Sequence, residues 1–127
     1  MFTTHAERLL IADDDPNLLD AYKFFFETHG YEVLIAGDGM AAFAAYCEWR
    51  PEAVVLDIQM PYLNGRAVAR QIRRLTATPG PLLLAITALS SPSDRAESMR
   101  SGFDHVFVKP AELPAVLAVI AACTRVR

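Results

Sequence analysis

The chain has 127 residues, which is the size of one domain and leaves no room for a second. Hydrophobic residues make up 53% and charged residues 21%, so the chain is neither disordered nor of low complexity. Twelve Lys and Arg against fifteen Asp and Glu give a net charge of −3, which argues against direct binding to a nucleic acid.

No segment has the pattern of a membrane span or of a secretion signal. The longest strongly apolar stretches, residues 81–86 and 113–123, are shorter than the roughly 18 residues that a span requires. The apolar residues 9–12 run directly into three aspartates, unlike a signal peptide. Cys47 and Cys123 have no metal-ligand spacing, which predicts reduced thiols packed as small hydrophobic side chains. We therefore expect a soluble, cytoplasmic protein.

Short apolar runs alternate with amphipathic segments along the whole chain. In chain order, the expected elements are strand 8–12, helix 16–29, strand 32–36, helix 40–49, strand 53–56, helix 66–75, strand 81–87, helix 94–101, strand 105–108 and helix 112–124. Gly30 is expected just beyond the end of the first helix. Trp49 and the aromatic run 24–26 are expected in the core or at its edge.

This order predicts an α/β fold. The strands are almost continuously apolar, which is typical of parallel strands covered on both faces. Five β–α repeats with right-handed crossovers give a three-layer sandwich, with a five-stranded parallel sheet and five helices. In such sheets ligands bind at the carboxyl ends of the strands.

Acidic, hydroxyl and amino side chains follow those strand ends. They are Asp13, Asp14 and Asp15 after the first strand, Asp57 after the third, Thr87 at the fourth and Lys109 after the fifth. Several carboxylates in one crevice repel one another unless a cation neutralises them, and oxygen ligands of this kind suit Mg²⁺. A carboxylate beside that metal can attack a phosphoryl group, while a lysine and a hydroxyl neutralise the phosphoryl oxygens.

Each of these residues also has a purely structural interpretation. Asp15 is expected to cap the following helix, since Pro16 suits its first position, but Asp13 and Asp14 exceed what capping needs. Asp57 alone could be a turn residue at a strand end. Thr87 and Lys109 alone carry no signal, and only their joint occurrence with the acids favours a site.

Four sequence pieces resemble a known family. They are residues 10–15 (LIADDD), 55–65 (VLDIQMPYLNG), 86–88 (ITA) and 108–110 (VKP). In this order and spacing the chain resembles the receiver domain of two-component response regulators over nearly its full length. The resemblance implies a flavodoxin-like sheet of strand order 2-1-3-4-5, with residues 1–127 as one receiver domain whose core spans about 7–124.

The resemblance also implies a role for each site residue. Asp57 would accept a phosphoryl group from a sensor histidine kinase or a histidine phosphotransfer protein, in a domain that is regulatory and not an enzyme. The implied Mg²⁺ ligands are Asp13, Asp14, Asp57 and the backbone carbonyl of Gln59. The implied phosphoryl contacts are Thr87, the Ala88 backbone N–H and Lys109. The family often has a cis peptide before the proline that follows this lysine, here Pro110.

Two positions depart from the family pattern. Many receivers carry an aromatic residue three positions before the lysine, and here that residue is Val106. Phe107 is adjacent, but strand alternation places it on the opposite face of the sheet. Leu89, two residues beyond Thr87, offers no hydrogen bond to a hydrolytic water, so we expect slow autodephosphorylation.

The last expected helix is apolar nearly all round, which predicts either burial on several sides or a partner. The resemblance implies a homodimer or an effector contact through the fourth helix, fifth strand and fifth helix. An alanine-rich face tolerated in water is the simpler alternative. Only 18 residues follow Lys109, so unless the chain is a fragment we expect output by protein contact, signalled by phosphorylation.

Two other functions fit parts of the pattern. In a haloacid-dehalogenase-type phosphatase, Asp13 and Asp15 would form the strand-end Asp-x-Asp motif, with Thr87 and Lys109 as later motifs. That fold needs an acidic pair after the lysine, whereas only Glu112 is present, and Asp57 would have no role. A receiver-like module that binds partners without phosphorylation is the second alternative.

Overall fold

The structure is a computed structural model that describes residues 7–77 and 79–124. Ten elements alternate along these described residues. They are β1 (Arg8–Ala12), α1 (Pro16–Thr28), β2 (Glu32–Ala36), α2 (Gly39–Trp49), β3 (Ala53–Asp57), α3 (Gly65–Leu75), β4 (Leu82–Thr87), α4 (Pro92–Arg100), β5 (His105–Val108) and α5 (Leu113–Thr124). The predicted order of elements is confirmed, with boundaries that differ by at most two residues.

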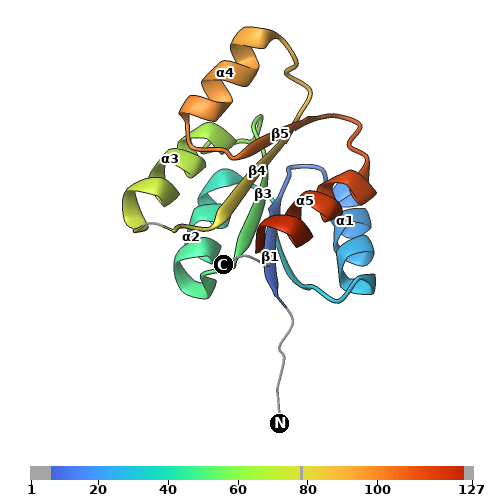
Figure 1. The fold of residues 1–127 in the computed structure, drawn as a ribbon. Helices are drawn as coiled ribbons and strands as arrows, with labels where there is room; N and C mark the ends of the chain where they lie inside the picture. Colours follow the sequence, from blue (N-terminus) through green and yellow to red (C-terminus); the bar gives the residue numbers. More distant parts are fainter. Residues whose placement is uncertain (1–6, 78, 125–127) are drawn as a thin grey trace.

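The five strands form one parallel sheet in the order β2-β1-β3-β4-β5. Helices α1 and α5 cover one face of this sheet, and α2 and α3 cover the other (Figure 1). The predicted three-layer sandwich and its strand order are therefore confirmed. Because every strand is parallel, all five carboxyl ends meet at one edge of the sheet.

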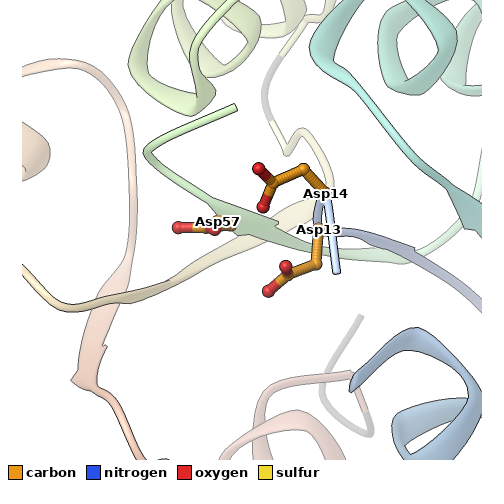
Figure 2. Close-up of side chains that lie close together, drawn as sticks. All are labelled: Asp13, Asp14 and Asp57. Carbon is orange, nitrogen blue, oxygen red and sulfur yellow. The ribbon is translucent and has the colours of Figure 1, made fainter. Parts of the chain in front are cut away.

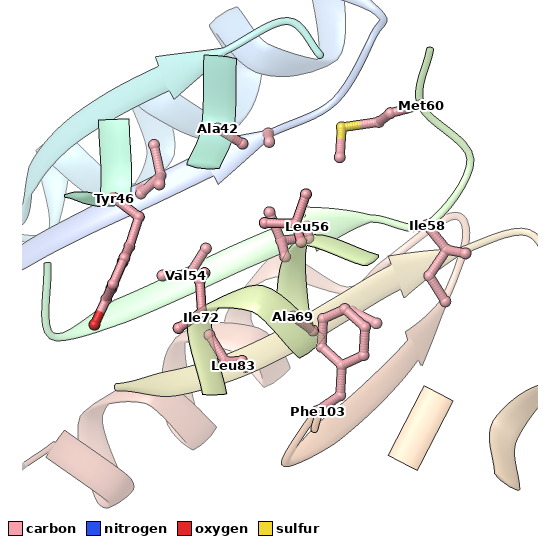
Figure 3. Close-up of a cluster of buried hydrophobic side chains, with 14 of the residues drawn as sticks. Ala42, Tyr46, Val54, Leu56, Ile58, Met60, Ala69, Ile72, Leu83 and Phe103 are labelled. Carbon is pink, nitrogen blue, oxygen red and sulfur yellow. The ribbon is translucent and has the colours of Figure 1, made fainter. Parts of the chain in front are cut away.

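Alternation along the central strands divides the core into two apolar clusters. Leu10 of β1 and Val54 of β3 point towards α2 and α3, in the cluster that Figure 3 shows. Their neighbours Leu9 and Val55 point towards α1 and α5. The two clusters cover the sheet on both faces, as is typical of buried parallel strands.

The predicted packing of the aromatic run on α1 is only partly confirmed. Phe26 is 1% exposed in the cluster beneath α1, and Phe25 packs against the same cluster. Phe24 is 74% exposed, so its expected place in the core is wrong. Successive helical residues are about 100° apart, so three in a row cannot all face the sheet.

Two further expectations need correction. Cys47 is exposed rather than packed, because Ala42 and Tyr46 occupy the buried face of α2. Helix α4 begins at Pro92, two residues before the expected Asp94, since Ser91 caps it and forms a reciprocal capping box with Asp94. Within the described ranges, no helix combines the length and the apolar character needed to cross a membrane.

Candidate metal and phosphoryl site

The sheet edge brings together side chains that are far apart in the sequence. Asp13 and Asp14 directly follow β1, Asp57 ends β3, and Lys109 directly follows β5. Since β1 and β3 are neighbours in the sheet, their acidic side chains lie close together (Figure 2). The order of the strands, rather than any local motif, therefore assembles this site.

The Lys109 ammonium bridges two buried carboxylates. Its Nζ donates to Asp13 Oδ2 at 2.9 Å and to Asp57 Oδ2 at 3.1 Å. Asp13 is 1% exposed and Asp57 5% exposed, so both carboxylates have lost most of their contact with water. Burying a charge without a partner is costly, and the lysine supplies that partner for both.

The second oxygen of each buried carboxylate is held by a backbone amide. Asp13 Oδ1 accepts from the Asp15 N–H at 2.9 Å, and Asp57 Oδ1 accepts from the Gln59 N–H at 3.2 Å. Asp15 is the N-cap of α1 and accepts from the Asn17 N–H, which confirms its predicted capping role. The turn that starts α1 thus fixes Asp13, and the turn that follows β3 fixes Asp57.

Three carboxylates form an acidic cluster. One oxygen each from Asp13, Asp14 and Asp57 lies within 4.8 Å of the others, with Asp14 exposed at the rim (Figure 2). Carboxylate oxygens at a partly open rim fit the oxygen preference of Mg²⁺, which takes one or two carboxylates and keeps waters. The residues present therefore suit a hard divalent cation.

The pKa values of two site groups are shifted. Burial raises the pKa of the Asp57 carboxyl, and the charge of Asp13 adds to that rise, while Lys109 opposes it. Burial alone would lower the pKa of Lys109, but its hydrogen bonds to Asp13 and Asp57 outweigh that effect and raise it. Lys109 is therefore held in its charged form.

The fourth strand contributes a buried hydroxyl. Thr87, 1% exposed, accepts through Oγ1 from the Leu89 N–H at 3.0 Å, and its carbonyl accepts from the Lys109 N–H at 2.8 Å. The second of these bonds ties the ends of β4 and β5 together. Ala88 and Gln59 are exposed beside their strand ends, and their predicted backbone roles stay predictions.

Val106 and Phe107, three and two positions before the lysine, lie on opposite faces of the sheet. Val106 is 8% exposed and belongs to the cluster on the α2–α3 face, whereas Phe107 packs against the opposite cluster. The predicted opposite facing of these residues is confirmed. The peptide bond between Lys109 and Pro110 is cis, as the resemblance implied.

Tyr22 of α1 is buried, and the structure also places it beside the site, which the sequence did not predict. It lines an apolar cavity of about 330 Å³ between α1 and the β5–α5 connection, together with Lys109. Burial and then the Asp13 charge raise the pKa of its hydroxyl. The helical stripe on α1 could reveal its burial, but not its distance from a lysine 87 positions away.

Replacing Gly65 by alanine should lower the free energy of unfolding by about 2 kcal/mol. A Cβ at this first residue of α3 would lie 2.3 Å from the Asp57 backbone oxygen, so the end of β3 that carries the acid must shift. Chemical unfolding measures the loss. Gly37→Ala is the control, since nothing lies within 4 Å of its Cβ, and an equal loss there would contradict the steric explanation.

The sequence profile of the response regulator receiver domain matches residues 9–121 of this chain. The chain belongs to the receiver domain family of response regulators. The receiver domain from Methanospirillum hungatei superimposes with a TM-score of 0.87 at 28% identity, covering 94% of each chain. The receiver domain of response regulator 1452 from Francisella gives 0.87 at 25% identity, covering 94% of this chain and 97% of that one.

Curated relatives are longer than this chain. Response regulator MprA of Mycobacterium leprae is 37% identical over 118 residues, which are 93% of this chain and 51% of that protein. The DNA-binding dual master transcriptional regulator RpaA of Synechocystis is 33% identical over 118 residues, 93% of this chain and 49% of that protein. This receiver chain thus spans about half the length of those regulators.

Proposed function

We propose that Asp57 is the phosphoacceptor of this receiver domain and that its donor is a phosphohistidine on a sensor kinase or a histidine phosphotransfer protein. The observation that carries this proposal is the bridge from Lys109 Nζ to Asp57 and Asp13. A carboxylate at such a strand end can attack a phosphoryl group as the nucleophile. The neighbouring lysine can then neutralise the phosphoryl oxygens.

In the proposed reaction a carboxylate oxygen of Asp57 attacks the phosphorus of the donor. A P–O bond forms as the P–N bond to the donor imidazole breaks, and the imidazole keeps the electron pair and takes a proton. Lys109 pairs with the free carboxylate of Asp57 and is placed to pair with the phosphoryl oxygens after the transfer. Thr87 and the Ala88 N–H are proposed to bind the other phosphoryl oxygens.

Asp13, Asp14, Asp57 and the Gln59 carbonyl are proposed to hold Mg²⁺. When bound, the ion supplies positive charge against the phosphoryl oxygens and offsets the repulsion among the acids. Asp13 is also tied to Lys109, so the same buried carboxylate serves both cations.

Labelling with acetyl phosphate tests the proposal. With Mg²⁺, the wild-type chain should gain one phosphoryl group per molecule, measured by intact mass, and Asp57→Asn should gain none. Asp20→Asn, an exposed acid on α1, is the matched control and should label like the wild type. Chelation of the metal should remove most labelling. Unlabelled wild-type protein would favour a phosphorylation-independent binding module.

A phosphate-release assay on the same samples distinguishes a receiver from a haloacid-dehalogenase-type phosphatase. A receiver is self-modifying and regulatory, so we propose that it releases no phosphate from a generic phosphomonoester. Within the described tail after Lys109, Glu112 is the only acid, so the acidic pair of that phosphatase fold is missing there. Steady turnover of the phosphomonoester would contradict the proposal.

We predict a phosphorylated form with a half-life of minutes or longer. Leu89 packs beside the apolar cluster near Thr87 and offers no hydrogen bond to orient an attacking water. Leu89→Asn should shorten the half-life by about tenfold, because an amide near the phosphoryl group can position that water. Decay after removal of acetyl phosphate measures it, and a wild-type half-life of seconds would contradict the prediction.

Three further expectations stay proposals. We propose that the chain is one receiver domain, that it acts in the cytoplasm without binding DNA itself, and that it signals through the α4–β5–α5 face. On that face Val108 is 45% exposed, and Ala115 and Ala118 of α5 are exposed. The alanine stripe leaves the surface only weakly apolar, so measuring the mass of the phosphorylated form in solution is needed to test for a dimer.

A further inference from the structure

Helix α4 is attached to α3 through polar contacts in matching register. Arg66, Arg70 and Arg73 lie four and three positions apart, so they share one face of α3. Asp94 and Ser98 of α4, with Ser101 at its C-cap, follow the same spacing. The two helices lie side by side, α4 above α3 in Figure 1.

Each arginine contacts α4 or the turn that follows it. Arg66 donates from Nε to Ser98 Oγ at 3.1 Å and from an Nη to the Asp94 carbonyl at 3.0 Å. Arg70 donates to Ser101 Oγ at 3.1 Å. Arg73 donates to the Gly102 carbonyl, the Pro81 carbonyl and Asp104, so it also anchors β4 and β5.

Apolar burial does not hold α4. Its one buried residue is Ser98, and Met99 is 44% exposed. In the described part of the chain, neither apolar cluster contains a residue of α4, whereas α3 contributes Val68 and Ile72, both fully buried. Polar contacts are replaced by water when they break, so their net contribution is small beside that of buried apolar surface.

We propose that α4 is a detachable lid. It opens as a unit by breaking the contacts to Arg66 and Arg70, while the sheet, both apolar clusters and the other helices stay folded. Val106 lies on β5, the strand that α4 contacts, and it becomes more accessible when α4 leaves. The lid is a property of the unmodified domain and is independent of the role proposed for Asp57. Local opening of this kind is expected where apolar burial is lowest.

Hydrogen exchange followed by mass spectrometry tests the lid. In the wild-type chain, the helical amides of residues 96–100 should exchange at least about tenfold faster than those of α3 and β3. Compared with the wild type, Arg66→Met should speed exchange in α4 by about a further tenfold and leave the exchange rate of β3 unchanged. Arg74→Met is the control, since Arg74 is exposed on the same helix and its side chain has no hydrogen bond or ion pair among the described residues.

A milder variant distinguishes local opening of α4 from a loss of stability in the whole domain. Ser101→Ala removes only the Arg70 contact and the bond to the Glu97 carbonyl, and it should speed α4 exchange about threefold without affecting β3. The lid is refuted if wild-type α4 and β3 exchange at one common rate. It is equally refuted if Arg66→Met and Ser101→Ala leave α4 unchanged, or speed all elements alike.

Discussion

Replacing Lys109 by methionine is expected to lower the free energy of unfolding by about 3 kcal/mol at pH 8 without divalent cations. The substitution leaves Asp13 and Asp57 buried side by side with no cation between them. Lys109 has a raised pKa, so it is charged at this pH in both states and its full contribution is present. That contribution disappears only as the pH rises through the raised value.

The pH dependence distinguishes lost charge from lost packing. Without Lys109 the pKa of Asp57, already raised by burial, should rise further, and the acid then protonates as the pH falls. The loss of stability should therefore shrink between pH 8 and pH 5.5, and Mg²⁺ should restore part of it at pH 8. Urea unfolding measures the loss of stability at the two pH values and its recovery with Mg²⁺. Lys23→Met on α1 is the control, and equal losses at the two pH values would contradict the electrostatic origin.

The fold and the composition of the site follow from different features of the sequence. The parallel sheet was predictable because apolar runs such as residues 53–56 have no polar face and must be covered on both sides. The convergence of Asp13 and Lys109, 96 residues apart, was predictable because parallel strands present their carboxyl ends at one edge. Neither inference needed a side-chain position.

The attachment of α4 could not be predicted in this way. Its sequence has almost no apolar stripe, and the arginines that hold it belong to α3, about 30 residues earlier. Periodicity describes how an element meets an apolar core, and it contains no information about polar contacts between two helices. The exposed Phe24 shows the reverse case, in which an apolar side chain has no core to meet.

Replacing Asp57 by asparagine is expected to stabilise the metal-free protein at pH 7 by about 1 kcal/mol, or roughly 4 °C in Tm for a domain of this size. Burial, and then the charge of Asp13, raise the pKa of Asp57, so the folded state favours the neutral acid. A carboxyl whose folded pKa is raised contributes stability that is fully present below the unfolded pKa. That stability is lost as the pH rises through the folded pKa.

The difference in stability between Asp57→Asn and the wild type should therefore be near zero at about pH 4. It should grow as the pH rises and level off above the folded pKa of Asp57. Thermal unfolding across this range measures it, with Asp20→Asn, an exposed acid, as the control that shows no such trend. A constant difference in stability at every pH would mean that the shape of the side chain, not its charge, causes the difference between the two proteins.

Saturating Mg²⁺ should narrow the difference in stability, because a cation among Asp13, Asp14 and Asp57 stabilises the wild-type carboxylate and leaves the amide less affected. If Mg²⁺ raised both melting temperatures equally, Asp57 would not be one of its ligands.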